Sequence, residues 1–462
     1  MRITTPTAHP VPAVVLAALV VAAATLAPAS AHAQAAGAAK LELPAVETWT
    51  LDNGLQVAFQ RVDGAPVVAV GVWYRAGSKD EPRERQGLAR MFERLMFLGS
   101  ERVRPGAHAG IIEGLGGYVD AAVSEDASSY LNVLPPAYLE LAMALEAERM
   151  RGLRLRDDAI AVARATLQDD VRRRERWPLA QGIRRFLHTA YTKHPYAWPA
   201  TGTVAGLGEA GAEELRRFYD AYYVPNNATL VVVGAVAVER VRAAVQTHFG
   251  ALARAAEPPR PAAQVVEPAL TEARRQVAEA GQVGIVLAGY HIPGAAHGDL
   301  PALQVAGLVL GLDSSARLSR RLVRTDKIAV EVGVPLFLRQ QAGLVLMFAA
   351  FVEPAAAGPI EQAMRAEIDA LRRAGPTAQE LSKAKSQLQA RLAFSLEDVG
   401  NLARQIGAAW ILTDDPGRWQ GDLARFAAVS AADVKRVVAS YLVPDKQIVV
   451  VVPPLGAASA PQ

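Results

Sequence analysis

The sequence contains no cysteine. This absence excludes disulfide bonds, thiolate metal ligands and a lipid anchor attached through a thiol. Aromatic residues make up only 6% of the chain, and the formal net charge of +3 arises from acidic and basic residues that are interspersed. A balanced charge of this kind gives no reason to expect a nucleic-acid partner. The chain has 462 residues, of which 51% are hydrophobic and 21% are charged. This is the composition of a globular protein, and the length allows more than one domain.

A long apolar run occurs only near the N-terminus. Arg2 precedes residues 13–26, which are rich in Val, Ala and Leu, and an A-x-A pattern ends at Ala33. We therefore expect residues 1–33 to be a signal peptide, cleaved near Ala33, and the mature protein to be periplasmic or secreted. Because no other segment is long and uncharged enough to cross a membrane, we expect no membrane span in the mature chain.

One segment of the chain occurs twice. AEELRRFYDAYYVPNNATLVVV at 212–233 aligns without a gap with AADVKRVVASYLVPDKQIVVVV at 431–452, about 220 residues later. Each copy has the pattern of an amphipathic helix, a stop at Val-Pro, a polar turn and a β-branched strand. The duplication predicts two similar α+β half-domains. A proline-rich stretch, Glu257–Pro261, predicts the linker between them.

We place the N-terminal half-domain at 34–255, the linker at 256–272, the C-terminal half-domain at 273–455 and a short tail at 456–462. Period and turn signals predict the elements of the first half as strands at 47–51, 55–61 and 67–74 and helices at 87–98, 136–153 and 157–176. Those of the second half are strands at 283–290 and 343–352 and helices at 300–312, 358–374 and 378–396, the last of them capped by Thr377.

The most informative segment is GLARMFERLMFLGS, residues 87–100. Arg90, Glu93 and Arg94 lie in this predicted helix with the spacing of His-x-x-Glu-His, an inverted zinc motif whose histidines lie one helical turn apart. Both histidine positions hold arginine here. Because arginine stays protonated and has no lone pair to give to zinc, the segment predicts the helix of a zinc peptidase without its metal-binding side chains.

Further motifs give the sequence a resemblance to the insulinase/pitrilysin family of zinc metallopeptidases. They are Phe97–Ser100, Gly116-Gly117, His194–Tyr196 and segments around Glu146 and the repeat, in family order and spacing along nearly the whole mature chain. The resemblance implies two homologous α/β-sandwich half-domains, insulinase-like or LuxS-like, that enclose a peptide chamber.

The resemblance also implies roles for individual positions. In active members two histidines and a distal glutamate hold zinc, and the motif glutamate activates water. The two histidines fall on Arg90 and Arg94 of this sequence and the distal ligand falls on Asp170, so we expect three vestigial metal positions and no cofactor in place of the family's zinc. The base falls on Glu93, retained but expected to be silent. A supporting glutamate of the family falls on Ala163.

Peptide-binding positions can be transferred in the same way. Residues 118–124 correspond to the edge strand on which peptides align in the family, and we expect peptide contacts at Tyr118, Asp120 and Ala121. Asp120 replaces an asparagine of the family. In the family, an Arg and a Tyr of the second half-domain also bind substrate. These two positions fall on Val323 and Val330 of this sequence, so the Arg/Tyr pair is not intact here.

The arginines of the motif suggest a charge replacement. Without zinc, Glu93 and Asp170 would repel one another in a partly buried place. Guanidinium groups at Arg90 and Arg94 could pair with them instead, and we expect such salt bridges within about 6 Å. The alternatives are that both arginines are solvated surface residues, or that zinc binds a site assembled from distant histidines.

Three functions follow from these observations. The first is a non-catalytic homologue that contributes peptide-binding surface to a zinc-bearing paralogous subunit, as heterodimers of an active and an inactive chain recur in the family. The second is an active zinc metalloendopeptidase with unconventional ligands. The third is a stand-alone periplasmic peptide-binding scaffold, monomeric or a homodimer.

Overall fold

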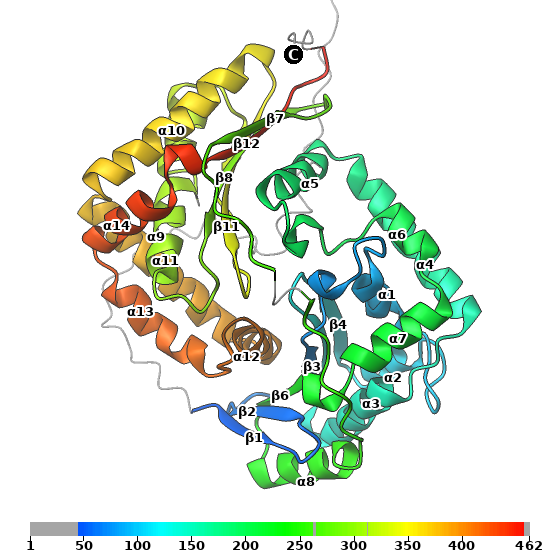
Figure 1. Ribbon diagram of the computed structural model, residues 1–462. Coiled ribbons are helices and arrows are strands. Elements are labelled where there is room, and N and C mark those ends of the chain that lie inside the picture. The colour runs from blue at the N-terminus through cyan, green and yellow to red at the C-terminus, as the bar shows by residue number, and fades with distance from the viewer. Residues whose placement is uncertain (1–44, 262–264, 312, 457–462) are drawn as a thin grey trace, which may run out of the picture. The chain divides into compact units, whose positions relative to one another are not determined.

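The computed structural model describes residues 45–261, 265–311 and 313–456. The predicted signal peptide at 1–33 and residues 457–462 of the predicted tail lie outside these ranges. The described chain is α+β, as predicted, with two six-stranded sheets formed by segments on either side of 256–272 (Figure 1). Among the helices of the described ranges, none has both the length and the apolar character required to cross a membrane.

The first sheet has the strand order β1-β2-β6-β3-β5-β4, so β4 forms one edge. Its strands are β1 (Glu47–Thr50), β2 (Gln56–Arg61), β3 (Val68–Tyr74), β4 (Tyr118–Val123), β5 (Ser128–Leu134) and β6 (Ala228–Gly234). The predicted hairpin between β1 and β2 is confirmed, with Gly54 at φ 87° in its turn. Every residue of β3 and β6 is buried, because both faces of these central strands are covered.

Helices of the first half pack on this sheet and on one another. They are α1 (Leu88–Leu95), α2 (Ala107–Gly114), α3 (Leu139–Arg151), α4 (Asp157–Glu175), α6 (Val204–Glu209), α7 (Ala212–Tyr222) and α8 (Val238–Phe249). Helix α1 ends at Leu95 rather than at Leu98 as predicted. Its apolar pattern continues to Leu98, but Gly99 adopts φ 111° and the chain turns before it.

The second sheet has the order β10-β11-β8-β12-β7, and β9 also pairs with β11. Its strands are β7 (Arg274–Val277), β8 (Gly284–Ile292), β9 (Glu331–Gly333), β10 (Leu336–Phe337), β11 (Gly343–Phe351) and β12 (Ile448–Val452). The helices beside it are α9 (Leu300–Gly311), α10 (Ala357–Ala374), α11 (Ala378–Leu396), α13 (Asp422–Ala428) and α14 (Ala431–Tyr441). The predicted cap of α11 is confirmed, since the Thr377 side chain accepts a hydrogen bond from the Glu380 amide.

The sequence repeat corresponds to a structural repeat. In the first copy α7 is followed by a 3₁₀ turn at Pro225–Asn227 and by β6. In the second copy α14 is followed by a 3₁₀ turn at Pro444–Lys446 and by β12. Each copy therefore delivers one interior strand to its own sheet.

Two helices are exchanged between the halves. Helix α5 (Pro178–Ala190) comes from the first half but packs on β8 and β12 of the second sheet, where Phe186 and Leu187 join a buried cluster with Leu287. Helix α12 (Val399–Thr413) comes from the second half and packs on β3 and β6 of the first sheet (Figure 1). Neither of these helices was predicted from the sequence, and local patterns do not indicate which sheet a helix covers.

Candidate functional site: the motif helix and the adjacent edge strand

A buried carboxylate fixes the start of the motif helix α1. Glu81 accepts hydrogen bonds from the Gly87 amide at 2.7 Å and from the Ala89 amide at 2.8 Å, and it is only 4% exposed. These two amides belong to the first turn of the helix, whose backbone donors have no partner within it. Burial raises the pKa of Glu81 to about 8, against the opposing effect of the two hydrogen bonds. The sequence alone did not single out Glu81, because a loop separates this residue from the helix that it caps.

Both predicted salt bridges of the motif arginines are present. Arg90 forms an ion pair and hydrogen bond with Glu93, which is 8% exposed. Arg94 reaches from α1 to α4, where its Nη2 lies 3.7 Å from Oδ2 of Asp170. Burial raises the pKa of Glu93, and the positive charges of Arg90 and Arg94 oppose that rise. The positions predicted as base, distal ligand and histidine replacements are therefore brought together.

The side chains present at this helix do not fit zinc. Arg90 and Arg94 stand where nitrogen ligands would be needed, and protonated guanidinium groups cannot coordinate a cation. The two carboxylates are engaged as well, Glu93 by Arg90 and Asp170 by an ion pair with Arg173. Within the ranges that the structure describes, no group of three or more His, Asp and Glu residues lies close enough together to hold a metal ion.

Helix α4 adds further positive charge to this place. Burial lowers the pKa of Arg90, and the positive charge of Arg174, which lies one helical turn after Asp170 on α4, adds to that effect. Arg172, in contrast, pairs with Asp169 at 2.8 Å on an exposed face, as expected for a solvated helix surface.

The edge strand β4 presents free backbone groups beside α1. Within the described residues β4 pairs only with β5, in a register that sets Ala121 opposite Tyr130. The Ser124 amide donates to the Ala127 carbonyl at 2.8 Å and closes the turn. In an antiparallel ladder, residues that exchange hydrogen bonds with the partner strand alternate with residues that do not. Because Ser124 is hydrogen-bonded to Ala127, the amides and carbonyls of Val119, Ala121 and Val123 face the open edge. The side chains of these three residues pack against the core that includes α1.

The other face of β4 is held by the exchanged helix α12. Arg404 donates to Oδ2 of Asp120 from Nε at 3.1 Å and from Nη2 at 2.9 Å. Tyr118 is 39% exposed, and burial together with the negative charge of Asp398 raises its pKa. Arg404 lies 284 positions from Asp120, and no motif marked it in the sequence.

The positions predicted for the second substrate-binding pair lie in the second half. Val323 is in the helical turn Ser319–Thr325, and Val330 is 63% exposed. Arg321, two residues before Val323, is paired with Asp326 at 2.6 Å. The described residues give no second set of substrate ligands at these positions.

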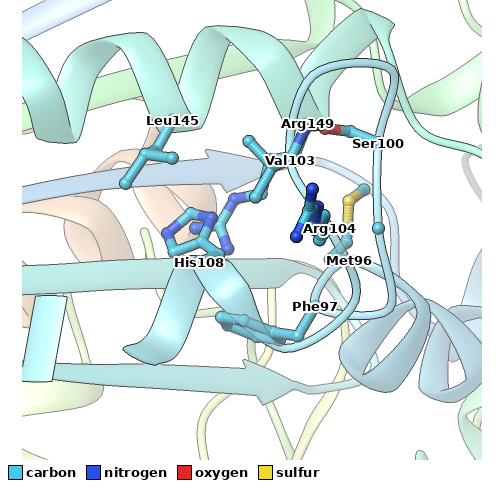
Figure 2. Close-up of a pocket in the computed structure, with 9 residues that line it drawn as sticks. Met96, Phe97, Ser100, Val103, Arg104, His108, Leu145 and Arg149 are labelled. Atoms are coloured by element: carbon cyan, nitrogen blue, oxygen red, sulfur yellow. Dashed lines mark hydrogen bonds between the residues drawn. The ribbon is translucent and has the colours of Figure 1, made fainter. Parts of the chain in front are cut away.

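A small pocket behind the motif helix has a structural role. His108 donates from Nε2 to Oδ1 of Asn132 at 2.8 Å, Asn132 donates to Glu146, and Nε of Arg149 donates to Glu146 at 2.9 Å. Figure 2 shows His108, Phe97 and Arg149 around this pocket, whose volume of about 10 Å³ is no larger than one water molecule. The motif around Glu146 thus builds a buried polar network rather than a substrate site.

Next to the end of β4, a buried ionic cluster joins the two halves. Asp126, in the turn between β4 and β5, accepts hydrogen bonds from Nζ of Lys79 and from the Tyr196 hydroxyl, both at 2.6 Å. Its second oxygen accepts from the Gln340 amide at 3.1 Å, which comes from the hairpin between β10 and β11. The turn that follows the edge strand is therefore fixed to the second half.

A buried arginine reinforces this junction. Arg339 is 2% exposed, and its Nη2 donates to Oε1 of Glu125 at 2.7 Å. Its guanidinium carbon lies 4.6 Å from the ring centre of Tyr196. The His194–Tyr196 motif is explained by this contact, because it supplies the ring on which the arginine stacks.

Comparisons with known proteins agree with this architecture. Residues 56–203 match the family model described as Insulinase (Peptidase family M16), and residues 210–388 match the model described as Peptidase M16 inactive domain. The chain is 28% identical over 417 residues to the zinc protease PqqE of Helicobacter pylori, which covers 89% of this chain and 92% of that protein.

Solved structures show the same fold. A protease from Helicobacter pylori superposes with a TM-score of 0.85 at 27% identity, over 89% of this chain and all of that one. A peptidase M16 inactive domain from Pseudomonas fluorescens gives a TM-score of 0.81 at 18% identity, over 90% of this chain. Taken with the two half-domains, the repeat and the motif helix, these matches show that the chain belongs to the insulinase family of peptidases, family M16.

Proposed function

We propose that this protein is a non-catalytic member of the insulinase family that binds peptides along β4 and acts as the partner of a zinc-bearing paralogous subunit. One observation carries the first part of the proposal. Guanidinium groups occupy both histidine positions and are paired with Glu93 and Asp170. The residues that would bind zinc and activate water are therefore committed to one another.

Peptide binding is supported by the exposed backbone of the edge strand. An extended peptide can add to β4 through the outward amides and carbonyls of Val119, Ala121 and Val123. The contacts of Asp120 with Arg404 and of Asp126 with Lys79 hold the strand and its turn in place. A rigid edge of this kind loses little entropy when a peptide pairs with it.

The partner and the location rest on the sequence. Pairing of an inactive chain with an active one recurs in the family, so a zinc-bearing paralogue is the partner that the resemblance favours. The pattern at residues 1–33 supports a periplasmic or secreted location for this chain, which its partner would share.

Zinc content of the purified chain is the direct test. We expect elemental analysis after dialysis against trace zinc to find none bound, and we expect no peptidase activity. The variant Arg90→His/Arg94→His/Asp170→Glu restores the family's ligands and should bind zinc. One zinc per wild-type chain, with peptidase activity that Glu93→Gln abolishes, would establish the active enzyme instead.

The partnership needs a separate experiment. Light scattering of the chain mixed with zinc-bearing paralogues encoded by the same organism should show a one-to-one complex. A chain that stays monomeric, or forms only a homodimer, while binding peptides would establish the stand-alone scaffold.

A further inference from the structure

At the place where the family binds its cation, this chain has more positively than negatively charged side chains. Two carboxylates lie there, and they are those of Glu93 and Asp170. Four guanidinium groups lie on the same two helices: Arg90 pairs with Glu93, Arg94 and Arg173 pair with Asp170, and Arg174 lies one helical turn after Asp170 on α4. The local excess of positive charge repels a metal ion and attracts an anion.

Two of the four guanidinium groups keep unused hydrogen-bond donors. Arg94 lies 3.7 Å from Asp170, which is beyond hydrogen-bond distance, and its side chain is 45% exposed. Arg174 lies one helical turn after Asp170 on α4, is exposed, and has neither an ion pair nor a side-chain hydrogen bond among the described residues. We call Arg94 and Arg174 the open arginine pair. Arg90 and Arg173 are occupied, since each already forms a short pair with a carboxylate.

The open arginine pair lies on elements next to the proposed peptide strand. Helix α1 contacts both β4 and α4, and its Arg94 reaches Asp170 of α4, so the helix that carries Arg94 adjoins the edge strand. A peptide strand added to β4 extends the sheet beside α1. Every second side chain of such a strand points to the face that α1 covers.

We infer that the open arginine pair binds a carboxylate of the peptide that pairs with β4, so that the protein selects acidic peptides. This inference rests on the proposed peptide binding. The carboxylate belongs either to an Asp or Glu side chain or to the peptide's C-terminus, and guanidinium groups bind both through paired hydrogen bonds. The replacement of histidine by arginine then exchanges a metal site for an anion site.

The test uses one labelled β-forming peptide in four forms. The peptide carries Glu or Gln at its centre and has a free or an amidated C-terminus, and its affinity for the purified full chain is measured by fluorescence anisotropy. We expect the forms with the recognised carboxylate to bind roughly tenfold more tightly than the forms without it. The preference should shrink between low and high salt, because both arginines are accessible to counterions. The Glu-to-Gln arm identifies a side-chain carboxylate, and the amidation arm identifies the C-terminus.

Variants locate the effect. Arg94→Gln/Arg174→Gln should abolish the preference, so that the variant binds the four forms of the peptide with equal affinity. Arg172→Gln is the matched control, since it removes an exposed arginine of α4 that pairs with Asp169, and it should keep the preference.

The outcomes separate this inference from the proposed function. Equal affinities of all four peptides, or a preference that survives in the double variant, would overturn the anion site and leave peptide binding at β4 intact. Failure of every peptide to bind, including at low salt, would remove the proposed peptide function and the anion site with it.

Discussion

Arg404 of α12 holds Asp120 of β4 through two hydrogen bonds to the same carboxylate oxygen, at 2.9 and 3.1 Å. The contact crosses from the second half of the chain to the edge strand of the first. Both side chains are more than a third exposed, so the pair is screened by solvent.

We expect Arg404→Gln and Asp120→Asn each to lower the free energy of unfolding by less than about 1 kcal/mol. Because the two side chains contact each other, the double variant should lose less than the sum of the single changes. Urea unfolding of the wild type and the three variants gives this coupling. Strictly additive effects would show that the contact is not made in solution.

The cap of the motif helix gives a second prediction. Glu81→Ala leaves the amides of Gly87 and Ala89 buried without acceptors, so we expect it to lower the free energy of unfolding by about 1–2 kcal/mol. Chemical denaturation measures the change. Glu84→Ala is the control, because Glu84 is exposed in the same loop, and it should change stability by less than about 0.5 kcal/mol. Equal losses in the two variants would refute the capping role.

The buried histidine predicts a pH dependence. Burial and the nearby charge of Arg149 lower the pKa of His108 to about 3. Between that pH and about 6.5 the unfolded chain binds a proton at this residue and the folded chain does not. The stability that His108 contributes is therefore complete above about pH 6.5, and it falls by roughly 1.4 kcal/mol per unit as the pH drops below that value.

Unfolding midpoints measured from pH 7 to pH 4 test this predicted fall in stability. His108→Gln should make the decline shallower, because it removes the buried imidazole that is not protonated in the folded chain. A decline that is identical in wild type and His108→Gln would assign the acid sensitivity to other groups.

The ionic cluster at the turn after β4 predicts a large effect. Asp126→Asn leaves the Lys79 ammonium with only neutral acceptors in a buried place, and we expect a loss of about 3 kcal/mol in the free energy of unfolding. Asp63→Asn breaks an ion pair in which the Asp63 side chain is 73% exposed, and it should cost less than about 0.5 kcal/mol. Similar losses in both variants, measured by thermal unfolding, would mean that water reaches Lys79.

Local signals allowed much of the fold to be predicted. The start of α11 follows from Thr377 and the Glu380 three residues later, which form a capping box. The two copies of the repeat fixed α7 with β6 and α14 with β12, because proline can begin a new turn but cannot continue a helix. Local patterns of this kind are contained in a few consecutive residues.

Contacts between distant segments were beyond the reach of such patterns. The pairing of Arg94 with Asp170 was predictable only because the resemblance assigned both positions to one metal site. Arg404 carries no such assignment, so its contact with Asp120 could not be found. Glu81 was missed because a capping carboxylate from a preceding loop has no fixed spacing from the helix it caps.

The two exchanged helices meet their sheets through glycines. A Cβ added at Gly407 of α12 would lie 2.2 Å from the Trp73 ring of β3, and one added at Gly182 of α5 would lie 2.7 Å from Leu287 of β8. The backbones therefore approach so closely that no side chain fits between helix and sheet.

Because of this exchange, the first sheet is synthesised well before the helix that covers one of its faces. The first sheet is complete once Gly234 has been made, but α12, which covers one of its faces, begins only at Val399. At translation rates of roughly 5–20 residues per second, the interval is on the order of 10–30 s. Until α12 is made, the sheet face that it covers in the folded chain has no helix over it, so the first half on its own exposes apolar surface.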